Sequence, residues 1–308
     1  MDHMSQINLA LLDHEVQYIR DQIFFLQLTC KSLQIELKVQ NNVDKQMKNI
    51  IIEGDISGKF EDDRTYIRNN PSQFSMILTE HLHHSPDRGS FLNGIPVVSD
   101  FSPEVDPRVF PSTRFKALVE NAYGIPLFLT CGELPAIGTY SSLFPDSSFA
   151  QLPWPAYSVN TTKPKRKGLV FPIPSPALMT PFRSEVLKEI AQQGCNVRVL
   201  HSKSIPESIK ICTRYSAVLD VAKSSHWRYD SPMRSFISIL AGRHRVNIRH
   251  STITSPISEI CNLTFLEYLS FSETELDVLT SRMSSRFETF VKAQDTQPLE
   301  VFLEWLYR

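Results

Sequence analysis

The sequence lacks the short glycine motifs that hold phosphate groups or catalytic serines in common α/β enzymes. No GxGxxG pattern follows an apolar run, so a bound dinucleotide is not expected. The chain has no GxxxxGK[ST] loop, which disfavours ATP hydrolysis of the P-loop kind. It also has no GxSxG pattern, which removes the usual nucleophile elbow of hydrolases. Any phosphate-binding site must therefore use another part of the backbone.

Cysteine pairs, long apolar runs and an excess of one charge are also missing. The five cysteines are scattered without a CxxC pair, which is typical of reduced thiols and gives no zinc-binding pattern. No run approaches the roughly 20 apolar residues of a membrane span, and the first residues lack the basic segment of a signal peptide. The formal net charge of -1 creates no strong field for nucleic acid or an anionic membrane. We expect a cytoplasmic protein with no transmembrane segment, no metal and no organic cofactor.

Short apolar runs alternate with stretches of helical periodicity along the 308 residues, a length that suits two domains. Strands are expected at residues 7–12, 34–39, 50–52, 74–79, 95–99, 126–130, 168–173, 196–200, 217–222, 245–248 and 265–271. Helices are expected at residues 15–33, 113–121, 180–194, 206–214 and 231–242, and in a tail over 273–308 that breaks near Gln297 and Pro298. The alternation predicts an α/β fold with parallel sheets and helices on both faces.

The segment 143–167 interrupts this alternation. Several prolines bracket aromatic residues there, and the segment ends in the basic run KPKRK at 163–167. We interpret it as the connection between an N-terminal domain at 1–160 and a C-terminal domain with a helical tail at 161–308. The basic run is interpreted as a solvated linker, although a phosphate or nucleic-acid contact is an alternative.

The stretch 215–250 carries the strongest functional signal. An apolar run is followed by a polar loop and then by Ser231, Pro232 and Arg234, which together predict the start of a helix. Gly242 predicts its end. This order predicts a helix N-terminus at the carboxyl edge of the sheet, where free N–H groups and the helix dipole suit a phosphate. An ordinary crossover unit that binds nothing is the alternative.

This unit resembles the donor-binding half of GT-B glycosyltransferases, mainly over residues 167–250. The Ser231–Pro232–Arg234 opening and the closing Ala241–Gly242 pair carry the resemblance. It implies two Rossmann-like domains facing a cleft, with C-terminal helices crossing back to the first domain. It also implies metal-independent transfer of a sugar from a nucleotide-sugar donor to an acceptor hydroxyl. A Glu in this loop often holds the donor ribose in that family, whereas Asp230 is the only acid after the strand here.

Two loops supply the expected donor contacts. The loop that leads into the helix at 180–194 can approach the diphosphate, and the loop before Ser231 offers cations and an aromatic ring for a nucleobase. The alternative for Arg183 is a solvated side chain on a capped helix. The candidate donor-binding residues are Ser175, Thr180, Arg183, Lys223, Tyr229, Ser231, Pro232 and Arg234.

Two pairs of residues are candidates for acid–base work on the acceptor. Asp13 and His14 follow the first predicted strand, and Glu80 and His81 follow the strand at 74–79. The carboxyl ends of parallel strands are where such groups gather, and a base suited to a sugar hydroxyl has a pKa near neutral. Asp13 has a purely structural alternative as a helix cap. The spacing of the histidines at 81–84 does not favour a zinc site.

Two other readings of function stay open. One is a non-catalytic α/β scaffold that binds a nucleotide or a partner, since the expected ribose-binding Glu is missing. The other is a glycosyltransferase whose acceptor is modified DNA rather than a glycan or another hydroxyl compound, using the basic residues Arg243, His244, Arg245, Arg249 and His250. The alternation at 245–249 fits a strand with one solvent-facing side equally well.

Overall fold

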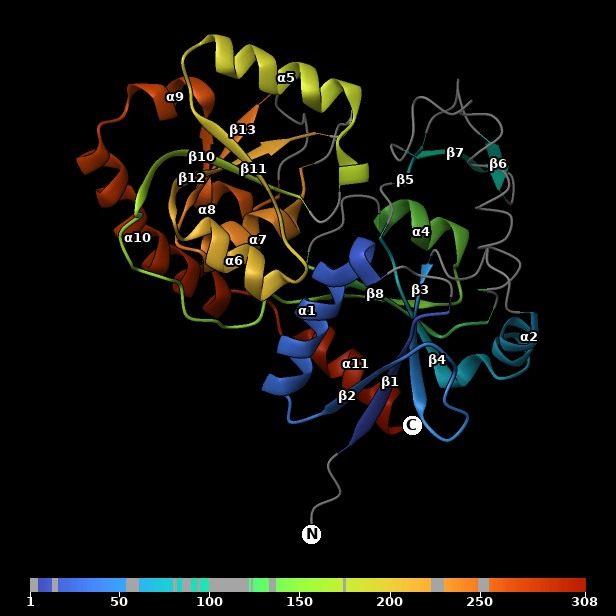
Figure 1. Ribbon diagram of the computed structural model, residues 1–308. Coiled ribbons are helices and arrows are strands. Elements are labelled where there is room, and N and C mark those ends of the chain that lie inside the picture. The colour runs from blue at the N-terminus through green and yellow to red at the C-terminus, as the bar shows by residue number, and fades with distance from the viewer. Residues whose placement is uncertain are drawn as a thin grey trace. The chain divides into compact units, whose positions relative to one another are not determined.

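The computed structural model divides into two compact units (Figure 1). It describes residues 5–12, 16–53, 61–79, 82–84, 90–92, 95–99, 122, 124–132, 137–173, 176–222, 230–248 and 255–308. One unit contains Met1–Pro155 and Asp295–Arg308, and the other contains Ala156–Gln294. The division differs from the expected 1–160 and 161–308 chiefly because the end of the tail joins the first unit.

The first unit is built on a six-stranded sheet in which every neighbouring pair is parallel. Its strands, in spatial order, are β2 (Glu36–Gln40), β1 (Gln6–Ala10), β3 (Lys48–Ile52), β4 (Phe74–Ile77), β8 (Leu127–Cys131) and β9 (Ser148–Leu152). All four residues of β4 are buried, as expected for a strand covered on both faces. Helix α1 (Val16–Ser32) packs against β2 and β8.

The second unit is built on a five-stranded parallel sheet. Its strands, in spatial order, are β11 (Val197–His201), β10 (Arg166–Ile173), β12 (Tyr215–Val221), β13 (His244–Ile248) and β14 (Asn262–Thr264). Side chains of α5 (Pro181–Gln192) and α9 (Phe265–Ser270) share one apolar core with the sheet, whereas α6 (Ile205–Cys212) lines the core on the other face. The structure is therefore an α/β fold with two Rossmann-like units, as the sequence predicts.

Each sheet contains a point at which the strand order reverses. In the first sheet, β1 lies between β2 and β3, so the chain moves first to one side and then to the other. In the second sheet, β10 lies between β11 and β12 in the same way. Open α/β sheets bind ligands outside the carboxyl ends of the strands at such switch points. Ligand binding is therefore expected at the carboxyl ends of β1 and β3 in the first sheet, and of β10 and β12 in the second.

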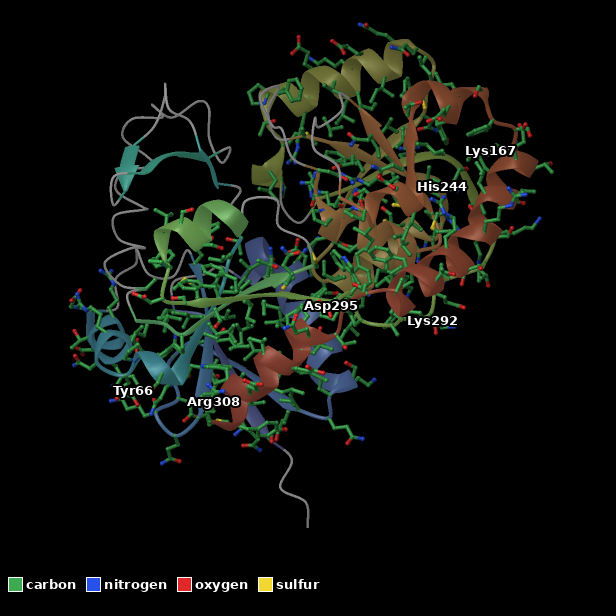
Figure 2. The ribbon with its side chains drawn as sticks, turned by 180° about the vertical axis from the view of Figure 1, so that it is seen from behind. Tyr66, Lys167, His244, Lys292, Asp295 and Arg308 are labelled. Atoms are coloured by element: carbon green, nitrogen blue, oxygen red, sulfur yellow. The ribbon has the colours of Figure 1, made fainter. Side chains whose placement is uncertain are left out.

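The helical tail serves both units. Helix α10 (Glu273–Lys292) belongs to the second unit, and α11 (Gln297–Tyr307) belongs to the first. Figure 2 shows the chain passing from Lys292 through Asp295 into the last helix, just before the chain end at Arg308. Phe302, Trp305 and Leu306 are buried, and α11 packs against β9. The expected return of the C-terminal helices to the first domain is confirmed.

Residues 265–271 form a helix rather than the expected strand. The Thr264 hydroxyl caps α9 by accepting a hydrogen bond from the Glu267 N–H at 3.1 Å. The Glu267 carboxylate in turn accepts one from the Thr264 N–H at 2.7 Å. This reciprocal capping box fixes the first turn. The helix leaves Leu266 and Leu269 exposed, so the apolar run that suggested a strand does not mark a buried one.

The region 143–167 is not a single connection. Strand β9 lies inside it and forms one edge of the first sheet, with Phe149 stacked on Phe128 at 5.2 Å between ring centroids. Trp154 is buried against Phe25. The passage to the second unit therefore starts after Pro155.

Further elements of the first unit differ from the expected alternation or lie outside it. Residues 95–99 form β7 (Ile95–Ser99), which pairs antiparallel with β5 (Leu82–His84) and β6 (Ser90–Leu92) in a separate small sheet. Helix α2 (Glu61–Asn69) precedes β4, and α4 (Ile137–Leu143) precedes β9. In the second unit, the short helix α8 (Ser258–Cys261) precedes β14. The helix expected at 113–121 lies outside the described residues.

Candidate functional site

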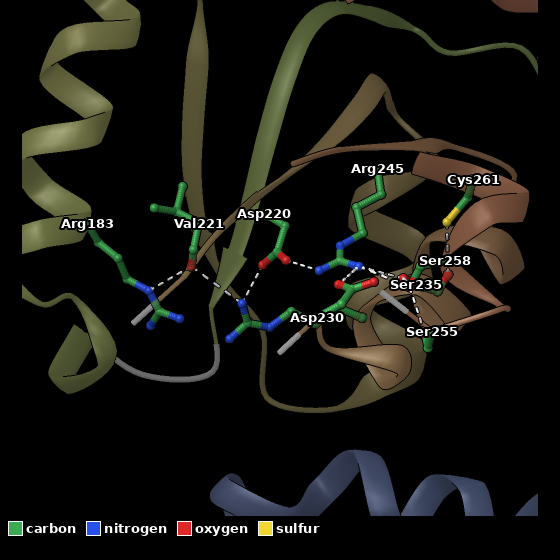
Figure 3. Close-up of polar contacts among 10 residues, drawn as sticks. Arg183, Asp220, Val221, Asp230, Ser235, Arg245, Ser255, Ser258 and Cys261 are labelled. Carbon is green, nitrogen blue, oxygen red and sulfur yellow. Dashed lines mark hydrogen bonds and ion pairs between the residues drawn. The ribbon is translucent and has the colours of Figure 1, made fainter. Parts of the chain in front are cut away.

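The carboxyl ends of β10 and β12 are joined by a buried arginine. Thr180 caps α5 by accepting a hydrogen bond from the Arg183 N–H at 3.2 Å, so Arg183 lies in the first turn. Its side chain is only 2% exposed. The Nε group donates to the Val221 carbonyl at 3.1 Å (Figure 3). Nη1 donates to the Leu178 carbonyl at 2.6 Å. The guanidinium therefore ties the loop before α5 to the end of β12.

A second arginine reaches the same carbonyl from helix α7 (Pro232–Leu240). Arg234 donates through Nη1 to the Asp220 carboxylate, and the same nitrogen lies 3.5 Å from the Val221 carbonyl oxygen. We call Arg183 and Arg234 the arginine pair. Burial, followed by the charge of Arg234, lowers the pKa of Arg183 to about 9, with Asp220 acting in the opposite direction. Arg183 is still a cation at neutral pH.

Three buried ionic groups form the interior side of this site. Arg245 donates to the Asp220 carboxylate and to the Ser235 hydroxyl, the latter at 2.6 Å, and forms an ion pair with Asp230 (Figure 3). Burial raises the pKa of Asp220, but the neighbouring charges of Arg234 and Arg245 outweigh it and hold that pKa well below its usual range. Asp220 therefore stays ionised and shares its charge between two guanidinium groups.

The charge of this cluster does not balance. The charge cluster comprises Arg183, Asp220, Asp230, Arg234 and Arg245, which are three cations and two anions and give a net charge of about +1. In the described part of the chain, no carboxylate lies within ion-pair distance of Arg183. Buried cations are costly without a counter-charge. An anion bound beside the arginine pair would compensate the excess.

The start of α7 lies beside the cluster and, among the described residues, has a backbone N–H without a backbone acceptor. Ser231 occupies the N-cap position, but its hydroxyl makes no capping hydrogen bond. The Arg234 and Ser235 N–H groups donate to the Ser231 carbonyl at 3.1 and 3.2 Å, and Pro232 has no N–H. Within the described residues, the Met233 N–H is the first-turn donor that has no such acceptor. A helix start in this state suits an anion.

The structure brings together part of the expected donor site. Arg183 and Arg234 converge at Val221, with Ser231 and Pro232 on the same helix start as Arg234. Thr180 uses its hydroxyl to cap α5, and the solvated alternative for Arg183 is wrong because the side chain is buried. The remaining candidates lie outside the described residues and stay predictions: Ser175, Lys223, Tyr229, Asp13, His14, Glu80 and His81.

Sequence reasoning missed Asp220 and Arg245, although the sequence contains a signal for Asp220. An acidic residue interrupts the apolar run YSAVLDV close to its end, where the carboxyl edge of a parallel strand lies. Arg245 was assigned to a basic surface group, yet it is 1% exposed. Its partners at positions 220 and 230 are remote in the sequence, so only the fold reveals the pairing.

Glu53 is a further carboxylate that sequence reasoning missed, and it lies at the switch point of the first sheet. It directly follows β3 and is 2% exposed. Its Oε2 accepts from the Thr79 N–H at 2.9 Å, and its Oε1 accepts from the Tyr140 hydroxyl at 2.6 Å. Thr79 immediately precedes Glu80, so Glu53 fixes the backbone from which the predicted Glu80–His81 pair departs. A Glu directly after the run Ile50–Ile52 was the available signal.

The residues expected to form a basic surface are buried. Arg243, His244 and Arg245 are 1%, 4% and 1% exposed, so neither a surface for DNA nor a strand with a solvent-facing side describes them. Arg243 donates to the carbonyls of Tyr215 and Thr162, both at 2.7 Å. It thus anchors the segment after residue 156 to the sheet. Arg249 and His250 lie outside the described residues.

Lys163 and Lys167, at the two ends of the basic run at 163–167, are exposed and paired. Lys163 contacts Asp277 at 3.0 Å, and Lys167 contacts Glu273 at 2.6 Å, with both lysine side chains more than four-fifths exposed. The exposure of Lys163 agrees with a solvated linker, whereas Lys167 lies in β10. Among the described residues, no group of His, Cys, Asp and Glu side chains could hold a metal ion, and no helix is long and apolar enough to cross a membrane.

Comparisons with known proteins add limited information. No protein-family model and no curated protein sequence matches the chain. Among the solved structures that are similar, an alpha1,3-fucosyltransferase matches 99% of this chain and 81% of its own, at 10% identity and a TM-score of 0.32. An alpha-glucosyltransferase solved with UDP and a 13-mer DNA containing an HMU base matches 99% of this chain and 100% of its own, at 7% identity and a TM-score of 0.35. Likeness at this level says nothing about activity. The strand order defines the chain as a two-unit α/β protein, and the charge cluster lies at the switch point of its second sheet.

Proposed function

We propose that the chain is a glycosyltransferase that moves a sugar from a nucleotide-sugar donor to an acceptor hydroxyl. One observation carries the proposal: a buried and a half-exposed arginine converge on the Val221 carbonyl at the switch point of the second sheet. The cluster carries a surplus positive charge next to a helix start at which, among the described residues, the Met233 N–H has no backbone acceptor. A diphosphate would neutralise that surplus and accept a hydrogen bond from that N–H.

The proposed chemistry assigns a task to each unit. As the bond between the sugar and the diphosphate breaks, negative charge grows on the leaving phosphate, and the arginine pair with the α7 N–H groups stabilises it. In this proposal that positive charge comes from protein side chains rather than from a metal ion. Ser175, Lys223 and Tyr229 would complete the donor contacts, with Tyr229 stacking on the base.

Acid–base work would come from the carboxyl edge of the first sheet. Asp13, His14, Glu80 and His81 are the proposed candidates for the group that takes the proton of the acceptor hydroxyl. Glu53 supports this choice of location, because it is a buried, hydrogen-bonded carboxylate that contacts the residue before Glu80. Glu80→Gln and His14→Ala should keep donor binding and lose transfer if either residue is the base.

Thermal unfolding in the presence of nucleotides tests donor binding. A panel of nucleoside diphosphates should contain one that stabilises the chain, by about 2.7 kcal/mol at 100 times its dissociation constant. Arg234→Gln should abolish the shift, whereas Arg282→Gln should not, because Arg282 is an exposed arginine on α10. The absence of a shift with every nucleotide and nucleotide sugar would remove the donor-site assignment.

Turnover then separates the enzyme from a binding protein. Release of nucleoside diphosphate from a nucleotide sugar, lost in Arg234→Gln, supports a glycosyltransferase. Nucleotide binding without turnover under any acceptor condition supports the scaffold function. A DNA acceptor would require salt-dependent duplex binding, and the burial of Arg243 and Arg245 counts against a basic surface for it. Glycans and other hydroxyl compounds are the first acceptors to test.

A further inference from the structure

The Arg234 side chain is held by one of its edges. Its Nη1 donates to Asp220, and the side chain is 43% exposed. In the described part of the chain, Nε and Nη2 of Arg234 make no hydrogen bond or ion pair with protein. These two nitrogens form one edge of the planar guanidinium, and an edge of this kind binds two oxygens of a phosphate at once. Arg234 therefore has one edge fixed by protein and another available to a ligand.

Asp220 is in turn fixed from behind. Its other oxygen accepts from Arg245, which is 1% exposed and is also paired with Asp230. Asp220 lies on β12, in the centre of the sheet, so its position is set by the strand. The sheet fixes Asp220, and Asp220 in turn holds the Arg234 guanidinium, which therefore has little rotational freedom. Restricting a long side chain in advance reduces the entropy lost when a ligand binds.

We propose that Asp220 is a positioning residue that orients the free edge of Arg234 toward a bound phosphate group. The proposal rests on the phosphate site of the proposed function and extends it. For the affinity of an anion, it predicts a change opposite in sign to the change that charge alone would cause. Removing an acid from an anion site should strengthen anion binding through charge alone. If Asp220 acts by orienting Arg234, removing its charge weakens anion binding despite the gain of net positive charge.

Asp230 provides the matched control. It is also buried, also pairs with Arg245, and has no contact with Arg234. Asp220→Asn and Asp230→Asn each remove one negative charge and leave Arg245 with one carboxylate. Inorganic pyrophosphate is the probe, with binding to the full chain followed by calorimetry. Asp220→Asn should bind pyrophosphate about tenfold more weakly than the wild type, whereas Asp230→Asn should bind it equally well or more tightly.

A double-mutant cycle separates positioning from a general structural effect. In the Arg234→Gln background, the further change Asp220→Asn should no longer weaken pyrophosphate binding, because only the gain of positive charge remains. Arg234→Lys keeps the charge on a half-exposed side chain but loses the fork, so it should bind nearly as weakly as Arg234→Gln. If Asp220→Asn does not fold, wild-type pyrophosphate affinity in Arg234→Lys would still contradict the proposal.

The outcomes distinguish the existence of the phosphate site from the positioning role of Asp220. If wild-type protein binds no pyrophosphate, the phosphate site and the proposed function fall together. If wild-type protein binds it but Asp220→Asn tightens binding as Asp230→Asn does, the positioning role is overturned and the site remains. Further weakening by Asp220→Asn in the Arg234→Gln background, or wild-type affinity in Arg234→Lys, would also overturn it.

Discussion

Arg183 keeps a positive charge among apolar neighbours because backbone carbonyls surround it. The Phe171 ring lies 5.6 Å from its guanidinium carbon, and the carbonyls of Val221 and Leu178 accept its hydrogen bonds. The sequence indicated that Arg183 opens a helix at a phosphate-facing loop. It could not indicate burial, since the acceptor at 221 comes from another strand. Local sequence patterns predict the secondary structure at a residue, whereas long-range contacts decide whether its side chain is buried.

Replacing Arg183 should destabilise the second unit. Arg183→Met leaves the two carbonyls without their donor, and each unsatisfied buried group costs about 1–3 kcal/mol. Removal of a buried charge offsets part of this cost, so we expect a net loss of about 1–3 kcal/mol. Urea unfolding measures it. Arg282→Met on exposed α10 is the control and should change the free energy of unfolding little. Equal stability of both variants would show that the carbonyl contacts are dispensable.

Asp220 should govern stability in acid. Its folded-state pKa lies below its ordinary value, so its carboxylate contributes stability above the unfolded pKa of about 3.9 and loses that contribution as the pH falls toward the lower folded value. The free energy of unfolding should therefore fall more steeply below pH 4 in the wild type than in Asp220→Asn. Asp277→Asn, which alters a solvent-accessible pair with Lys163, should follow the wild type. Parallel acid limbs for Asp220→Asn and the wild type would contradict this assignment.

At the scale of elements, helix starts were the most predictable feature. Thr180–Pro181 and Ser231–Pro232 open α5 and α7 where the sequence places them. The strand expected at 265–271 was wrong, although the Thr264–Glu267 pair is a sequence signature of a helix start. Strand β9 was hidden because prolines on both sides suggested a linker. A local apolar run was thus less informative than a capping pattern.

Two serines at helix starts should behave differently when replaced by alanine. Ser272 accepts from the Glu275 N–H at 3.3 Å in the capping box of α10, so Ser272→Ala should cost about 1 kcal/mol. Ser231 makes no such bond at α7, so Ser231→Ala should cost much less in the absence of ligand. Its effect should appear in pyrophosphate affinity. Chemical denaturation and calorimetry measure the two quantities, and a stability loss in Ser231→Ala equal to that in Ser272→Ala would refute the free-cap assignment.

For the whole molecule, the sequence predicted two α/β units and the return of the tail, and it placed the donor candidates in two loops of the second domain. The switch point itself follows from strand order, which no local pattern contains. β10 lies between β11 and β12, so the loops after Ile173 and Val221 open at the same edge of the sheet. Only this order brings Arg183 and Arg234 to one carbonyl. The charge excess there is therefore a property of the topology as much as of the residues.

The tail allows a direct test of how the chain is divided. Phe302 on α11 and Phe287 on α10 are close in sequence, and both are almost fully buried, but they belong to different units. Each Phe→Ala change should cost about 3–5 kcal/mol. Hydrogen exchange should then rise in β9 and its neighbouring strands for Phe302→Ala, because α11 packs against β9.

For Phe287→Ala, exchange should instead rise in α7, where Phe236 lies 6.0 Å from the Phe287 ring. Because α7 carries Arg234, this variant should also weaken pyrophosphate binding, whereas Phe302→Ala should leave that affinity unchanged. The two variants thus remove the same side chain from the same tail and differ only in the unit they serve. If Phe302→Ala loosened α7 as strongly as it loosened β9, the last helix would not belong to the first unit alone, and the chain would unfold as a single cooperative body.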